Sequence, residues 1–67
     1  MRTVIARWLV SLAKKNSLGG KFYVAFEVVA QKFGKPKSWV KANAKKIVAE
    51  CGVTADVSEN DFEIIVR

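Results

Sequence analysis

The chain contains no histidine and a single cysteine, Cys51, among its 67 residues. These absences exclude a disulfide within the chain and a four-ligand zinc site of the usual Cys/His type. They also remove the commonest general acid–base side chain. Gly19 and Gly20 stand without the lysine and hydroxyl residues that a phosphate-binding loop needs. We therefore expect neither a cofactor nor an enzymatic activity.

Long apolar runs are absent as well, because no stretch approaches the roughly 20 residues that a membrane-spanning helix needs. One unpaired cysteine suits a reducing cytoplasm, where we expect the protein. The length predicts one domain over residues 1–67, and so small a domain buries only roughly 60% of its unfolded surface. Such domains often need a partner for stability. We therefore expect a homodimer and no contact with a membrane.

Acidic residues are scarce in the first two-thirds of the chain. Residues 1–26 carry five cations and no acid, and residues 27–50 carry six lysines against two glutamates. Residues 51–67 carry four acids and one arginine, which leaves a net charge of +6 for the whole chain. The basic part can attract a polyanion, whereas the C-terminal part would repel one. The simpler alternative is that the lysines only keep the protein soluble.

Two segments have the apolar period of amphipathic helices. The first covers residues 3–15, and its apolar stripe consists of Val4, Ile5, Trp8, Leu9 and Leu12. The pattern predicts that a turn at 16–20 ends this helix. The second helix begins after Pro36 and runs to about Glu50, with Gly52 as its stop signal. Its predicted buried stripe consists of Val40, Ala44, Ile47, Val48 and Cys51.

Residues 21–33 fit two patterns. Phe22, Val24 and Phe26 alternate with other residues as they would in a strand. Phe22, Phe26 and Phe33 also fall on one helical stripe, and this second pattern continues through residues 30–33. We favour a helix, because no strand pattern survives at the end of the segment. Gly34 would end this helix.

The last fifteen residues change to a period of two. Val53, Ala55 and Val57 alternate with polar residues, and the alternation resumes at Phe62 after a turn at residues 58–61. We expect a β-hairpin with one apolar face. The predicted fold is therefore α+β, with three helices followed by a C-terminal β-hairpin.

Residues 26–45 resemble the helix-turn-helix unit of phage repressors and bacterial regulators. With Gly34 at the turn, Ala30 stands at the small position of the first helix. Val29, Phe33 and Val40 stand at the apolar positions that lock the two helices together. The chain departs from the family at Lys35, Pro36 and Asn43. The resemblance covers about a third of the chain and implies a helix-turn-helix or winged-helix domain, with the hairpin in the place of the wing.

The second helix of this unit has the features of a DNA-reading helix. Small residues on its outward face would let the backbone approach the major groove, and lysines one turn apart would meet phosphates or guanine edges. Asn43 falls towards the buried side and is a poor reader of adenine. The predicted contacts are Lys35, Lys37, Ser38, Trp39, Lys41, Ala42, Lys45 and Lys46, with flanking phosphate contacts from Arg2, Arg7, Lys14 and Lys15. Trp39 suits either a contact with the sugar-phosphate wall or the core.

These patterns predict binding to double-stranded DNA, as a small transcriptional regulator or accessory DNA factor. Because the reading helix has no arginine, we expect electrostatic attraction to supply a large share of the binding free energy, and we expect modest sequence specificity. The acidic hairpin complicates this hypothesis. It would either point away from DNA or pair its last strand with a second copy.

Two other classes of function stay open. The first is a small phage- or plasmid-encoded interaction module or inhibitor that binds a partner protein through the hairpin edge. The second is RNA binding through the same lysines and exposed aromatic side chains such as Tyr23 or Trp39, although the chain lacks the paired aromatic sheet motif of common RNA modules.

Overall fold

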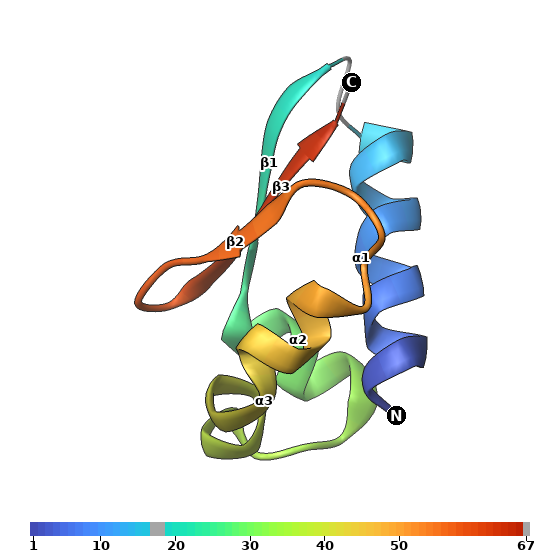
Figure 1. Ribbon diagram of the computed structural model, residues 1–67. Coiled ribbons are helices and arrows are strands. Elements are labelled where there is room, and N and C mark those ends of the chain that lie inside the picture. The colour runs from blue at the N-terminus through green and yellow to red at the C-terminus, as the bar shows by residue number, and fades with distance from the viewer. Residues whose placement is uncertain (17–18, 67) are drawn as a thin grey trace.

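Three helices cover one face of a three-stranded antiparallel sheet in the computed structural model, which describes residues 1–16 and 19–66 (Figure 1). The order along the chain is α1 (Arg2–Asn16), β1 (Gly20–Ala25), α2 (Phe26–Phe33), α3 (Lys37–Ala49), β2 (Ala55–Val57) and β3 (Asp61–Val66). The α+β class, the three helices and the C-terminal hairpin are confirmed. Among the described residues, no helix is long and apolar enough to cross a membrane.

The predicted helix over residues 21–25 is wrong, because this segment forms the edge strand β1. Gly20, the first residue of β1, has a φ of 104°, a left-handed conformation that glycine adopts without steric cost. The strand then pairs with β3 in the register Phe22↔Ile64 and Val24↔Phe62. Once a partner strand satisfies the backbone, the alternation of aromatic and β-branched residues decides the structure. The helix starts only at Phe26. Residues 26–33, which precede the turn at Gly34, are therefore helical as predicted.

Strand β3 lies in the centre of the sheet, whose order is β1-β3-β2. It pairs with β1 on one side and with residues of β2 on the other, in the register Val57↔Phe62 and Ala55↔Ile64. The idea that β3 could pair with a second copy is therefore wrong, since its pairing edges are occupied within the chain. The edges of the described sheet are β1 and β2.

The core lies between the helices and the inner face of the sheet. Phe26 and Phe62 meet edge to face at its centre, with ring centroids 4.9 Å apart. The apolar face predicted for the hairpin is confirmed by the burial of Phe62 and Ile64. The helices contribute Ile5, Ala6, Leu9, Ala13, Val29, Ala30, Val40, Ala44 and Ile47, and Cys51 follows the last of them.

Helix α1 is rotated slightly from its predicted orientation. Ile5 and Leu9 are buried as expected, and Trp8 packs edge to face on Phe33 at 5.5 Å. Val4 is 55% exposed instead of buried, and Ala13 takes part in the core. Small alanine side chains on this side let the sheet and α3 pack closely against α1. Of the turn predicted at residues 16–20, residues 17–18 lie outside the described residues.

Candidate nucleic-acid interface

Helix α3 presents one apolar and one basic side. Val40, Ala44 and Ile47 are fully buried or nearly so, as the sequence predicted. The opposite side is exposed and consists of Lys37, Ser38, Lys41, Ala42, Lys45, Lys46 and Ala49. The sequence interpretation named all of these except Ala49, which extends the strip of small residues towards the end of the helix.

The middle of this exposed side is a shallow strip between charges. At about 100° per residue, Ser38, Ala42 and Ala49 point in nearly the same direction, with Lys41 and Lys45 along one border. Lys21 and Glu63 form an ion pair at 3.6 Å. Within residues 1–16 and 19–66, no carboxylate forms an ion pair with a lysine of α3. The side therefore combines a low profile with uncompensated positive charge. We call these seven residues the α3 lysine face.

The turn between α2 and α3 sets the angle at which this face is presented. Gly34 adopts φ 65° and ψ 34°, and its N–H bonds to the carbonyl of Ala30. The N–H of Lys35 donates to the same carbonyl at 3.0 Å, which closes the end of α2. Pro36 then starts α3 in an extended conformation and accepts a 3.0 Å hydrogen bond from the N–H of Trp39. Ser38 thus lies in the first turn and makes no capping bond.

Trp39 belongs mainly to the body of the domain. Its side chain is half-buried against the core, and the ammonium group of Lys35 lies 5.1 Å from the ring centroid. The Lys35 charge is thereby held beside the start of α3. Of the two roles that the sequence left open for Trp39, packing against the core is the one that its burial supports.

Helix α1 meets α3 along a polar seam. Arg2 donates to the Oδ1 atom of Asn43 at 3.3 Å, and Thr3 donates to the Oε2 atom of Glu50 at 3.0 Å. The Nδ2 atom of Asn43 donates to the carbonyl of Trp39 at 2.9 Å. Asn43 is half-buried and hydrogen-bonded to both Arg2 and Trp39, in agreement with its predicted position towards the buried side of the helix. Arg2 therefore lies next to α3.

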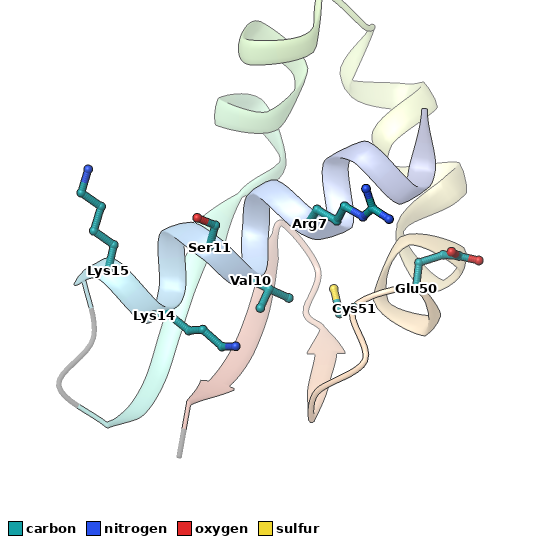
Figure 2. A pocket seen from close by; sticks show the side chains of 7 residues that line it. All are labelled: Arg7, Val10, Ser11, Lys14, Lys15, Glu50 and Cys51. Carbon is teal, nitrogen blue, oxygen red and sulfur yellow. The ribbon is translucent and has the colours of Figure 1, made fainter.

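Arg7, Lys14 and Lys15 lie elsewhere, on a groove along α1. The groove is lined by these three cations with Val10, Ser11, Glu50 and Cys51, and its volume is about 530 Å³ (Figure 2). The spacing of Arg7, Ser11 and Lys14 indicates a polar helical side, but only the fold brings Glu50 and Cys51 against it. The predicted site residues are thus divided between the α3 lysine face and this α1 groove.

Cys51 forms part of the floor of the α1 groove. Its thiol lies 3.5 Å from the carbonyl of Ile47 and 4.0 Å from that of Ala6. Burial raises the pKa of the Cys51 thiol above its ordinary value of 9.0, because the charged thiolate is poorly solvated there. The thiol is therefore protonated at neutral pH, as expected for a core residue.

The hairpin places acids beside the basic helix. Asp56 and Glu59 are exposed, and Asp61 is half-buried at the start of β3. The Asp56 carboxylate accepts the N–H of Val57 at 2.7 Å. In Figure 1 the turn between β2 and β3 and the first turn of α3 both lie at the left, and α1 lies at the right. Within the described residues, no cluster of three or more Cys, Asp or Glu side chains is placed to hold a metal ion.

Comparison with known proteins returns no matching protein family, no similar curated protein and no similar solved structure. The α3 lysine face and its surroundings are therefore the features from which a function can be inferred.

Proposed function

We propose that the protein binds double-stranded DNA by placing the α3 lysine face in the major groove. The observation that carries this proposal is the exposed, unneutralised row of lysines bordering a strip of small residues. A protein that replaces counterions at several phosphates gains affinity for any duplex sequence. The role would be that of a small regulator or accessory DNA factor.

The shape of the face suits close approach to DNA. The major groove of B-DNA is about 12 Å wide and admits one α-helix. Ser38 and Ala42 offer little bulk between the helix backbone and the floor of the groove. Lys41 and Lys45, one turn apart, would reach phosphates or guanine edges. Since α3 carries no arginine, the bidentate contact that most often specifies guanine is missing, and we expect modest sequence specificity.

The order of elements gives separate support. Helix α2, a glycine turn and α3 followed by a hairpin resemble the arrangement of winged-helix domains, in which the hairpin forms the wing. Wings that touch DNA are usually basic, whereas this turn carries Glu59 and lies next to Asp61. The proposed complex would therefore depend on α3 and the α1 seam rather than on the hairpin.

The test is a salt titration of binding to a random-sequence duplex by the parent and by the double variant Lys41→Ala, Lys45→Ala. Each lost phosphate contact lowers the slope of log K against log salt by about 0.9, so the double variant should lower it by about 1.8. The control is Lys21→Ala, Lys32→Ala, which removes the same charge from β1 and α2. Equal slopes for the two double variants would show that the α3 lysines make no particular contact.

A second candidate function is supported by the edge position of β2. This strand is three residues long, carries Asp56 and pairs only with β3 in the described sheet. A partner protein could add a strand there. If the parent binds no duplex at about 50 mM salt, where a basic domain should show non-specific affinity, this candidate replaces DNA binding.

A further inference from the structure

The cations of this protein are divided between two sides of the molecule. The α3 lysine face is one, and the α1 groove with Arg7, Lys14 and Lys15 is the other. We propose that the α1 groove is a second site for the phosphate backbone, so that one molecule holds two DNA duplexes together. The proposal rests on the proposed function, since the first duplex would occupy the α3 lysine face.

The orientation of α3 shows why one duplex would not cover both sites. Asn43 of α3 and Glu50, which caps the C-terminal end of α3, bond to α1, so they mark the side of α3 that faces that helix. At about 100° per residue, Lys41 and Lys45 each lie roughly 160° around α3 from Asn43. These two lysines of the α3 lysine face therefore point away from α1, whereas Lys46 lies nearer to α1, roughly 60° from Asn43. In Figure 1, α1 and the first turn of α3 lie at opposite sides of the view.

The stiffness of DNA prevents one duplex from reaching both sites without a large bend. A duplex has a persistence length of about 50 nm, whereas the whole domain measures 30 × 21 × 19 Å. Wrapping one duplex around so small a body would require a sharp bend. Two duplexes on opposite sides require none.

The groove has the chemistry of a phosphate site. Figure 2 shows Arg7 and Lys14 on either side of Val10 and Cys51, while Lys15 points outward near the end of α1. The arginine fork can bind phosphate oxygens bidentately, and lysine supplies a point charge. The hydroxyl of Ser11 can donate a further hydrogen bond.

The single acid of the groove does not cancel this charge. The groove has three cations and one carboxylate, Glu50, which already accepts a hydrogen bond from Thr3. Within residues 1–16 and 19–66, none of the three cations forms an ion pair. The net charge of the groove is therefore positive and available to an anion.

Capture of one duplex by another tests the proposal. One duplex is immobilised on beads, and a second, fluorescent duplex is added with the parent protein at about 50 mM salt. We expect capture of the fluorescent duplex by the parent. The variant Arg7→Gln, Lys14→Gln should lose at least about tenfold of this capture while it still binds a single duplex, since each lost phosphate contact weakens binding. Glutamine has nearly the helix propensity of arginine and lysine, so α1 should persist.

The matched control is Lys21→Gln, Lys32→Gln, which lowers the net charge equally and should keep the capture. Circular dichroism establishes that each variant is folded, and a second variant, Ser11→Glu, places a repelling charge in the groove through a different residue. The proposal is supported if both groove variants lose capture while the matched control keeps it.

Three outcomes would overturn it, and they are distinguishable from failure of the proposed function. If the parent binds a single duplex but never captures a second one, only the second site is refuted. If the groove variants capture as well as the control, the bridging arises elsewhere. If sedimentation shows a parent dimer that becomes monomeric in the groove variants, two α3 lysine faces of a dimer explain the capture. If the parent binds no duplex at all, the proposed function itself fails.

Discussion

Helix α3 and the β2–β3 hairpin use the same construction with opposite charge. Each buries one apolar side in the common core, with Val40 and Ile47 on the helix and Phe62 and Ile64 on the hairpin. Each turns the other side outward, where the helix carries lysines and the hairpin carries Asp56 and Glu59. The core constrains only the inward side. The outward side is free to acquire charge for function. The opposite charges of the two outward sides therefore indicate which of them would attract a polyanion.

The largest effect should come from the inward side of the hairpin. Phe62 is fully buried against Phe26, so Phe62→Ala should cost about 3–5 kcal/mol of the free energy of unfolding. A domain of this length has only about 3–10 kcal/mol in total, so much of the population should unfold. Urea unfolding followed by tryptophan fluorescence measures the change.

Tyr23 provides the outward control for Phe62, because it is an exposed aromatic residue on the same sheet. Tyr23→Ala should change the free energy of unfolding by no more than about 0.5 kcal/mol. Similar losses for the two variants would mean that the sheet has no distinct inward side.

A smaller effect should follow from changing the charge of the hairpin turn. Glu59→Lys should tighten binding to duplex DNA severalfold at about 50 mM salt, because it replaces a repelling charge with an attracting one. Glu59→Gln should give about half of that change in binding free energy. The folded structure should tolerate both, since Glu59 is exposed.

Gln31→Lys on α2 makes the same change in net charge as Glu59→Gln and serves as the comparison. If the Glu59 variants bind no more tightly than this control predicts, the hairpin turn points away from the duplex. The α3 lysine face would then act without any influence from the acidic region.

The smallest effect concerns Cys51, which lies between the two regions. Because burial raises the pKa of the Cys51 thiol above 9.0, the unfolded chain ionises first as the pH rises. The stabilising contribution is therefore complete below pH 9 and is lost above it, by at most about 1.4 kcal/mol per pH unit. Urea unfolding between pH 8 and pH 10 measures this loss.

Cys51→Ala is the reference for that experiment, because it removes the thiol and leaves every other ionisable group in place. The parent should lose more stability than this variant over the same interval. If the free energy of unfolding of the two proteins falls equally with pH, the loss is due to groups other than the Cys51 thiol. Alkylation of the native thiol at pH 7 should also be slow compared with alkylation in urea.

The sequence predicted the two clearest periodic regions well. The buried stripe and lysine face of α3 follow from a repeat of 3.6 residues, and the inward side of the hairpin follows from a repeat of two. The end of α2 at Phe33, directly before Gly34, also agrees with the predicted stop signal. Such patterns are local, so they survive in any fold that buries the apolar side.

The error in residues 21–25 has a different origin. Phe22 and Val24 satisfy both a strand and a helix pattern, and the choice depends on Ile64 and Phe62, about forty residues away in the chain. Pairing with β3 supplies the backbone hydrogen bonds that a helix would otherwise make internally. No short window of sequence contains that information.

The sequence by itself therefore determined which stretches of the chain are basic, which stretch is acidic, and which sides of α3 and of the hairpin are buried. Only the tertiary structure decided that β3 is central and that Arg7 and Lys14 share a groove with Glu50 and Cys51. The physical reason is that periodicity reports the burial of a residue within its own element. The position of one element relative to another is set by long-range packing and strand pairing.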